Sequence, residues 1–339
     1  MNYLIRLLTV SVFLITAAFQ PDRKEKIITV TGEISPYENG IWLSHEHVLV
    51  DFASAEAADT LRYDPEAAFR IILPEIEKLN NYGVKIFVEC TPKYLARDVL
   101  LLKKLSEATG ILFLTNTGYY GAVDNKFIPE NVFSLSAEGI AQKWIYEFEE
   151  GIEGTGIRPG FIKIGVNRGD LSEFHGRLAH AAALTHKSTG LVIMSHTGTA
   201  PGAFQQLEIL KQEGVAPDAF IWTHAQSEKD LSKHVEAANS GAWIALDGFR
   251  GSNGQDHSYV EMIKNLKENN CLHRLLLSHD AGYYKPEQPD GGKYAPHTAI
   301  FEKLIPALKE AGITTEELKL LLEVNPANAF TVKKRLIRF

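Results

Sequence analysis

The stretch Leu43-Ser44-His45-Glu46-His47 places two histidines two residues apart at the end of an apolar run. Side chains at positions i and i+2 of a β-strand point to the same face, so His45 and His47 would converge on one point. Converging imidazoles are typical of a metal site. An isolated pair of this kind is more often explained by one histidine in the core and one in a loop. The pair alone therefore does not establish a metal site.

Further polar residues lie within or directly after later apolar runs: Lys163 inside residues 161–165, then His196, His224 and Asp280 at the ends of three more. Each has a structural alternative, because a lysine can turn outward between helices and a strand-end histidine or aspartate can bind loop backbone. Chance does not readily explain six such side chains in strands whose ends share one rim of the fold. We therefore predict a metal centre from His45, His47, Lys163, His196, His224 and Asp280.

The elements that position these residues follow a repeating pattern. Eight short apolar runs alternate with eight helical patterns, the runs lying at residues 41–47, 84–90, 111–115, 161–165, 191–196, 219–224, 243–247 and 275–280. Continuous apolar strands indicate burial on both faces and hence a parallel sheet. Eight strand–helix units predict an α/β fold of the TIM (β/α)8 barrel type, whose active sites lie at the carboxyl ends of the strands. A doubly wound open sheet is the alternative, but no Gly-x-Gly-x-x-Gly follows an early strand.

The N-terminal region carries two separate signals. Arg6 precedes an apolar run over residues 7–19 that ends in small residues and is followed by a polar stretch, which predicts a signal peptide over residues 1–20 rather than a buried helix. The protein is then expected to be exported, periplasmic or secreted, without stable membrane insertion. Residues 27–34 alternate and contain a glycine, which predicts a short β-hairpin outside the barrel. Residues 21–339 would form a single hydrolase domain.

Composition limits the classes of partner. The chain has 339 residues, 45% of them hydrophobic, and a net charge of −7 with no basic stripe. This argues against nucleic-acid binding and favours a small-molecule substrate. Cys90 and Cys271 are far apart in sequence and lie beside apolar runs, so buried free thiols are expected rather than a disulfide.

Several motifs, taken in order, resemble the phosphotriesterase family of the amidohydrolase superfamily. They are Ser-His-Glu-His at 44–47, Phe-Ile-Lys-Ile-Gly at 161–165, Ser-His-Thr-Gly at 195–198, Thr-His-Ala-Gln at 223–226, Ser-His-Asp-Ala-Gly at 278–282 and Asn-Pro-Ala-Asn-Ala-Phe at 325–330. The resemblance covers nearly the whole chain after residue 20. It implies two divalent ions, usually Zn²⁺, and relatives that are often homodimers. By this resemblance His45, His47 and Asp280 hold the inner ion, His196 and His224 hold the outer ion, and Lys163, as N6-carboxylysine, bridges them.

A carboxylated lysine makes chemical sense at such a position. Burial favours the neutral amine that adds carbon dioxide, and the product has two oxygens that can each bind a cation. Two cations would acidify a water between them and polarise a carbonyl or phosphoryl oxygen. Asp280 would then accept and pass on the proton of the attacking water.

Other candidate residues surround this centre. Tyr120 resembles the tyrosine that lactonase-type relatives place over the metals, and Tyr119 is the alternative contact. Substrate contacts are expected in the loops after the last two strands, from Arg250, Tyr283 and Tyr284. Asp247 would either orient a ligand histidine or have a purely structural loop role. Glu46 and His279 are expected to point away from the cavity and to pack or hydrogen-bond behind the ligands, while the remaining histidines are predicted at the surface: His175, His180, His186, His234, His257, His273 and His297.

The sequence thus predicts a metal-dependent hydrolase. Attack by a bridging hydroxide on a lactone or carboxylic ester is the favoured reaction, and hydrolysis of a phosphotriester is the main alternative. A third interpretation, an inactive barrel that uses its metal only to bind a ligand, is disfavoured by the complete ligand set.

Overall fold

The computed structural model describes residues 25–36, 40–53, 55 and 62–337. The predicted signal peptide, residues 1–20, lies outside the described residues, so export stays a prediction. Within the described part, β1 (Ile27–Thr29) and β2 (Gly32–Ile34) pair antiparallel. This confirms the predicted N-terminal hairpin. The Val30 N–H donates to the Phe113 carbonyl at 2.8 Å and attaches the hairpin to the barrel.

The central strands are parallel and follow one another in chain order. They are β3 (Ile41–Glu46), β4 (Val84–Glu89), β5 (Leu112–Leu114), β6 (Asn116–Thr117), β7 (Phe161–Gly165), β8 (Ile193–His196), β9 (Phe220–Thr223), β10 (Trp243–Leu246) and β11 (Leu275–Leu277). Only Thr115 separates β5 from β6, which together occupy the third of eight strand positions. The predicted (β/α)8 fold class is therefore confirmed.

Backbone pairing does not close the ring of strands. One sheet runs from β3 to β5 and the other from β6 to β11, and no backbone ladder joins β11 to β3 among the described residues. At this seam the Ser44 hydroxyl donates to the Leu277 carbonyl at 3.1 Å, and the His45 N–H donates to Ser278 Oγ at 2.9 Å. The Asp280 N–H donates to the His45 carbonyl at 3.0 Å. The first and last strands are thus joined by side chains and irregular backbone.

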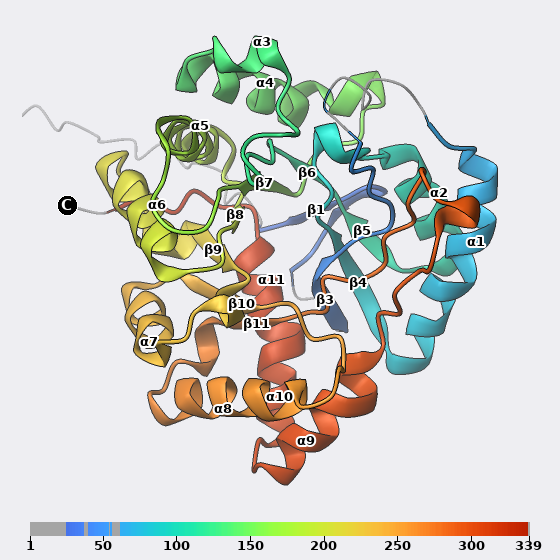
Figure 1. Ribbon diagram of the computed structural model, residues 1–339, viewed down its shortest axis with the longest axis vertical. Coiled ribbons are helices and arrows are strands. Elements are labelled where there is room, and N and C mark those ends of the chain that lie inside the picture. Colours follow the sequence, from blue (N-terminus) through green and yellow to red (C-terminus); the bar gives the residue numbers. More distant parts are fainter. Residues whose placement is uncertain (1–24, 37–39, 54, 56–61, 338–339) are drawn as a thin grey trace, which may run out of the picture.

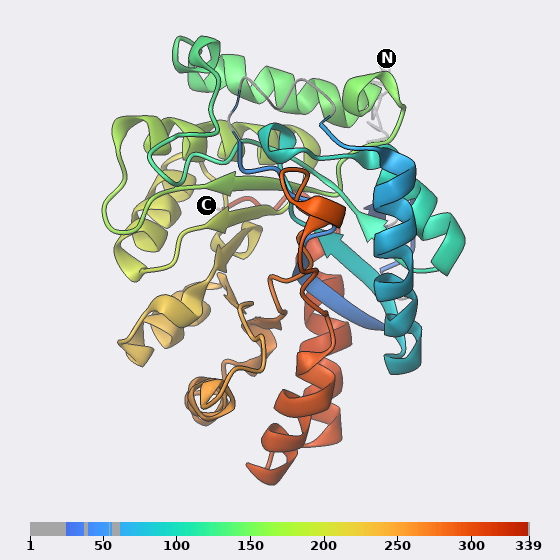
Figure 2. The ribbon, with the colours of Figure 1, turned by 45° about the vertical axis from the view of Figure 1, so that its right-hand side comes forward.

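Helices surround the strands on the outside (Figures 1 and 2). The α-helices are α1 (Pro65–Glu77), α2 (Val99–Thr109), α3 (Glu130–Phe133), α4 (Ala137–Glu150), α5 (Glu173–Thr189), α6 (Ala200–Gln212), α7 (Leu231–Ser240), α8 (Gln255–Glu268), α9 (Ile305–Glu310), α10 (Thr315–Lys319) and α11 (Asn325–Phe330). Ser136 caps α4 by accepting from the Gly139 N–H at 3.2 Å, and Asp98 caps α2. None of the described helices is long and apolar enough to cross a membrane.

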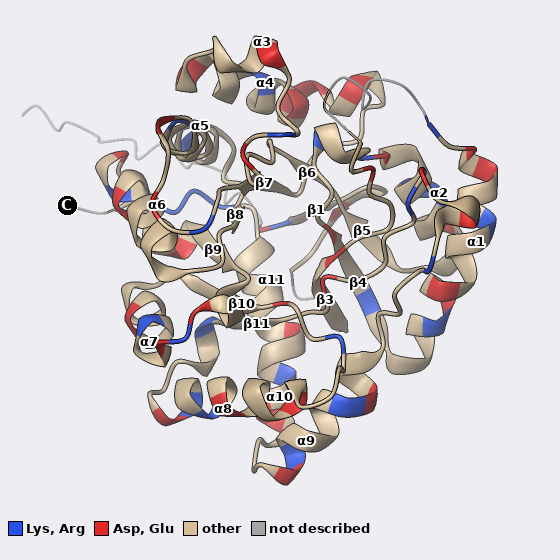
Figure 3. Cartoon of the chain, in the orientation of Figure 1, with Lys and Arg blue, Asp and Glu red and all other residues tan. Residues whose placement is uncertain are grey.

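The interior of the barrel is apolar below its carboxyl end. Inward-facing residues include Trp42, Phe161, Met194 and Leu276, and Phe330 of α11 packs with them. Acidic and basic residues are interspersed over the outer helices (Figure 3). Cys90 and Cys271 are both buried and free, as expected. Polar side chains gather instead where the strands end.

Candidate metal centre

The residues predicted as ligands come together at the carboxyl ends of the strands. Nε2 of His45 lies 3.4 Å from Nζ of Lys163 and 3.7 Å from Oδ1 of Asp280. The ring centroids of His45 and His224 are 5.1 Å apart, and those of His224 and His196 are 4.4 Å apart. One cavity is lined by all the predicted ligands, namely His45, His47, Lys163, His196, His224 and Asp280.

Local backbone geometry aims these side chains into the cavity. The register of β3 against β4 shifts between Leu43 and Glu46, just where the His-x-His pair begins. His224 directly follows β9 with a φ of 60°, and Asp280 follows β11 with a φ of 50°. A left-handed backbone is uncommon for a residue with a side chain, and it is frequent at functional sites.

Asp247, which follows β10, orients two of the histidines from behind. Its Oδ2 lies 2.7 Å from Nδ1 of His45, and its Oδ1 lies 2.8 Å from Nδ1 of His224. An ionised carboxylate only accepts hydrogen bonds, so each ring carries its hydrogen on Nδ1 and presents the Nε2 lone pair to the cavity. Of the two alternatives for Asp247, the structure therefore shows the orienting contact.

His47 is oriented by a residue that the sequence analysis did not single out. Its Nδ1 lies 2.8 Å from Oγ1 of Thr91, just after β4, and that hydroxyl also lies 2.9 Å from the Leu49 carbonyl. The single hydroxyl hydrogen goes to an acceptor such as this carbonyl, so Thr91 accepts from Nδ1–H of His47. Nε2 of His47 is then free and lies 3.2 Å from Oδ1 of Asp280. Thr91 follows directly after an apolar run, and this position in the sequence could have indicated that it lies near the ligands.

The pKa shifts of three of the four histidines favour metal binding. Burial lowers the pKa of His45 to about 4, and it also lowers the pKa values of His47 and His196. Burial alone would also lower the pKa of His224, but the charge and hydrogen bond of Asp247 raise it. Burial alone would raise the pKa of Asp280, but the neighbouring histidines His47, His45 and His224 lower it below its ordinary value. Neutral imidazoles beside an ionised carboxylate are the forms that bind a divalent cation.

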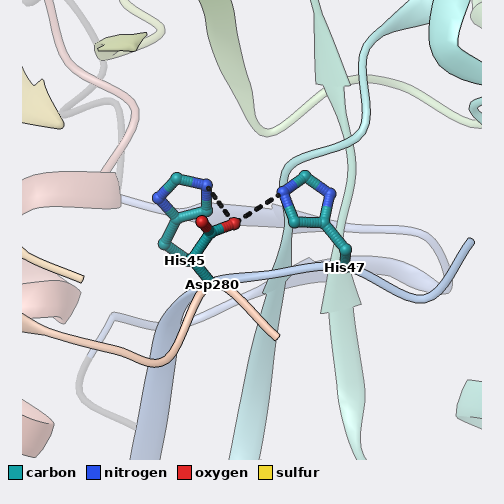
Figure 4. A group of neighbouring side chains, drawn as sticks. All are labelled: His45, His47 and Asp280. Atoms are coloured by element: carbon teal, nitrogen blue, oxygen red, sulfur yellow. Dashed lines mark ion pairs between the residues drawn. The ribbon is translucent and has the colours of Figure 1, made fainter. Parts of the chain in front are cut away.

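The side chains present fit a metal pair. His45, His47 and Asp280 offer donor atoms within 4.8 Å of one another, and Figure 4 shows both histidines facing the same carboxylate. Lys163 is 2% exposed and lies beside this group, while His196 and His224 continue it on the other side. The donor atoms of a second group, His45, His224 and Asp247, are also close enough to one another to hold a metal ion. Its contacts involve the Nδ1 atoms and have hydrogen-bond lengths, so we interpret Asp247 as an orienting residue.

The two adjacent tyrosines after β6 have different surroundings. Tyr120 lines the cavity, with its hydroxyl 3.3 Å from the ring nitrogens of His196. Tyr119 does not line it, because neighbouring residues of an extended chain point to opposite sides. Its ring packs against Tyr94 and Trp144, each at a centroid distance of 5.2 Å.

The expected substrate residues of the last loops are likewise divided. Tyr283 lines the cavity and stacks on His47 at a centroid distance of 4.7 Å, and its hydroxyl hydrogen-bonds to Asp280. Arg250 lies at the rim with its side chain 47% exposed, over the Tyr283 ring and 3.3 Å from Oδ2 of Asp280. Tyr284 is buried outside the cavity and packs near Tyr63.

Apolar residues that the sequence analysis did not identify form one wall of the cavity. They are Val50, Phe52, Pro92 and Leu95, and the cavity has a volume of about 80 Å³. Val50 and Phe52 follow the His-x-His motif, while Pro92 and Leu95 follow β4. These four residues follow strands that carry ligands or orienting residues, and this position in the sequence could have indicated a place near the cavity. Their apolar character alone does not distinguish residues of a cavity wall from residues of the core.

The prediction that the remaining histidines lie at the surface is wrong for His175, His186, His234 and His297, which are buried. In each of the four, at least one ring nitrogen has a polar partner in the interior. His175 donates through Nε2 to the Gly121 carbonyl at 2.9 Å, and His234 donates to the Ala225 carbonyl at 2.8 Å. These carbonyls directly follow Tyr120 and His224. His257 and His273 are exposed, and His180 is partly exposed.

Comparison with known proteins gives consistent matches over most of the chain. The sequence model of the phosphotriesterase family matches residues 25–330. A phosphotriesterase homology protein of Escherichia coli is 28% identical, over 86% of this chain and 98% of the relative. An aryldialkylphosphatase of Saccharolobus solfataricus is 28% identical, over 86% and 95%. An N-acetyltaurine hydrolase of Rattus norvegicus is 25% identical, over 91% and 98%.

Proposed function

The chain belongs to the phosphotriesterase family, and from this premise we propose that it is a binuclear metal-dependent hydrolase of lactones or carboxylic esters. The observation that carries the proposal is the convergence of four imidazoles, one carboxylate and one buried lysine on a single cavity. Three of the imidazoles have their Nδ1 atoms engaged by Asp247 or Thr91, so their Nε2 atoms are available to metal. This arrangement supports a catalytic centre over an inactive metal-containing binding protein.

Each residue has a role in this proposal. His45, His47 and Asp280 would hold one ion, His196 and His224 the other, and Lys163, carboxylated on Nζ, would bridge them. When bound, two divalent ions, which we expect to be Zn²⁺, polarise the scissile bond and make water at the site more acidic. The Asp280 carboxylate accepts the proton of the attacking water and passes it to the leaving oxygen. The Tyr120 hydroxyl, which lies 3.3 Å from the ring nitrogens of His196, would orient the substrate.

The small size and the apolar wall of the cavity favour a compact, uncharged substrate. Its wall away from the ligands is apolar, and the cavity is small, with a volume of about 80 Å³. A lactone or a short ester has a planar reacting carbon, so it needs less room there than a phosphorus atom with three substituents. This comparison favours the ester over the phosphotriester.

Two related substrate classes are the alternatives. The name of one relative, an aryldialkylphosphatase, supports phosphotriester hydrolysis, and that of another, an N-acetyltaurine hydrolase, supports amide hydrolysis. N-acetyltaurine carries a sulfonate, whereas Arg250, the cation at the rim, already contacts the Asp280 carboxylate and the Tyr283 ring. This engagement disfavours an anionic amide.

A metal analysis joined to a substrate screen tests the proposal. Purified protein should contain about two divalent ions per chain. The zinc-loaded enzyme should then be assayed on lactones, aryl esters, paraoxon-like triesters and N-acyl amino sulfonates. We expect the highest kcat/KM for a lactone or short ester. A preference for triesters or amides by orders of magnitude would overturn the substrate assignment, and metal-replete protein without any activity would overturn the enzymatic one.

A further inference from the structure

Glu46 separates the two histidines of the His-x-His motif, yet its side chain faces away from the cavity into the seam between β3 and β11. It is fully buried, with 0% exposure. Its Oε1 accepts from the Ser278 hydroxyl at 2.8 Å, from the His279 N–H at 3.0 Å and from His279 Nδ1 at 2.6 Å. Its Oε2 accepts from the Ala281 N–H at 3.0 Å and from His297 Nδ1 at 2.9 Å. One carboxylate thus receives five hydrogen bonds.

Two of these donors are the backbone N–H groups on either side of Asp280. The N–H of Asp280 itself donates to the His45 carbonyl at 3.0 Å, so three consecutive N–H groups are bound by two neighbouring residues of β3. These bonds hold the left-handed φ of 50° that turns the Asp280 carboxylate toward His45 and His47. They lie where no backbone ladder joins the two strands among the described residues.

We infer that Glu46 is a positioning residue for the metal centre, which fixes Asp280 relative to His45 and His47 without itself binding metal. This inference rests on the proposed binuclear centre. His45 and His47 are the chain neighbours of Glu46, and the two residues that flank Asp280 both donate to its carboxylate. A shift of Glu46 therefore changes the geometry of the inner ion. His196, on β8, has no such connection to Glu46 among the described contacts. The outer ion should therefore respond much less.

Glu46→Gln is an informative variant because all five partners are donors. The His279 ring must donate through Nδ1, since its Nε2 accepts from the Ile300 N–H at 3.0 Å. Whichever way the new amide is oriented, its NH₂ group faces the N–H of His279 or of Ala281. An NH₂ group cannot accept a hydrogen bond there, so one backbone N–H beside Asp280 loses its partner.

The experiment is a titration of metal-free protein with Zn²⁺ in competition with a chromophoric chelator. In Glu46→Gln we expect one of two sites to weaken about 10–100-fold, while the other keeps its affinity. Glu147→Gln is the matched control, because Glu147 is a largely buried acceptor from Arg97 and Thr117 and has no described contact with a proposed ligand. It should lower stability in urea and leave both zinc affinities unchanged.

Double variants identify the affected ion. In a His196→Asn background, Glu46→Gln should still lower the zinc affinity of the remaining inner site about 10–100-fold. In a His47→Asn background, where the inner site is already damaged, Glu46→Gln should cause little further loss of zinc affinity. Should Glu46→Gln fail to fold, Ser278→Ala removes one donor to Glu46 and the acceptor for the His45 N–H, and it should weaken the same site several-fold. Wild-type zinc affinity in a folded Glu46→Gln variant, or in Ser278→Ala, would overturn the inference. Fewer than two zinc sites in the unchanged protein would instead overturn the proposed function.

Discussion

Nδ1 of His45 lies 2.7 Å from Oδ2 of Asp247, and both side chains are at most 1% exposed. The other oxygen of the same carboxylate lies 2.8 Å from Nδ1 of His224. Burial alone would raise the pKa of Asp247, but the charges and hydrogen bonds of His224 and His45 lower it well below its usual range. One ionised side chain therefore sets the tautomer of two imidazoles, which by the proposed assignment serve different ions.

Asp247→Asn should weaken zinc binding. The amide offers one oxygen, so its NH₂ group faces the second ring, which must move its hydrogen to Nε2 and can no longer bind metal. We expect the affinity of one site to fall about 10–100-fold, measured by zinc titration. Asp256→Asn, at an exposed position on α8, is the control. Unaltered zinc affinity in Asp247→Asn would contradict the orienting role.

Lys163→Ala should lose the paired ions. The bridge requires a carboxylated Nζ, and alanine removes it together with the cavity contact to His45. Metal analysis should find fewer than two ions per chain, with kcat/KM lowered at least about 100-fold. Lys187→Ala, on the surface of α5, should retain both properties. Full occupancy in Lys163→Ala would exclude the bridging assignment.

Asp280→Asn should lower turnover far more than substrate binding. An amide cannot accept the proton of the attacking water, so we expect kcat to fall about 10²–10⁴-fold while KM changes by less than about 10-fold. The assay should use saturating Zn²⁺, with metal content measured in parallel, because Asp280 is also a proposed ligand. Unchanged kcat would remove Asp280 as the proton acceptor.

Leu95→Ala should change the preference for acyl chain length. Leu95 is 4% exposed and forms part of the apolar cavity wall, so its truncation makes room for a longer chain. Each added buried CH₂ contributes about 0.8 kcal/mol, so kcat/KM for a butanoate relative to an acetate ester should rise about 10-fold. Leu100→Ala, at a position 60% exposed, should leave this ratio unchanged. The same ratio in both variants would exclude Leu95 from the acyl site.

His186 should make stability depend on pH. Its Nδ1 donates to the Leu191 carbonyl at 2.7 Å and its Nε2 accepts from the Arg335 N–H at 2.9 Å. Burial lowers its pKa from 6.5 to about 4 in the folded state. The unfolded chain therefore binds the extra proton first, so the contribution of His186 is complete above pH 6.5 and decreases toward pH 4, by about 3 kcal/mol.

The test is urea unfolding of the wild type and of His186→Gln between pH 7 and pH 4. The difference in unfolding free energy between the two proteins should shrink as the pH falls, while exposed His257→Gln should show no such trend. A pH-independent difference would refute this account. Metal loss at low pH affects both proteins, so it cancels in the difference.

Much of the fold and of the cavity lining could be predicted from the sequence. Apolar runs followed by helical patterns predicted the barrel, and polar residues at strand ends predicted which side chains share the cavity. This worked because parallel strands carry their carboxyl ends to one rim, whatever the details of packing. Lys163 and Asp280 were therefore placed together despite their separation in sequence.

Features that depend on side-chain direction or partner choice could not be predicted. Tyr119 and Tyr120 are identical in type, and only the local strand geometry decides which one reaches His196. His175 and His234 lie on helices, where histidine is usually exposed, but each is buried and donates a hydrogen bond to the carbonyl of a residue outside its own helix, Gly121 and Ala225. Such pairings arise from tertiary structure and leave no local pattern.

The seam between β3 and β11 also determines when the protein can become functional during synthesis. The bond from Ala281 to Glu46 joins residues 235 positions apart. Closing a loop of that length costs about 5 kcal/mol in chain entropy, which the contacts at the seam must offset. A nascent chain therefore exposes His45 and His47 long before Asp280 exists, and it completes the inner ligand set only when the last strand docks. We expect high-affinity metal capture to be a late event of folding, and metal loss to accompany opening of the ring at this seam.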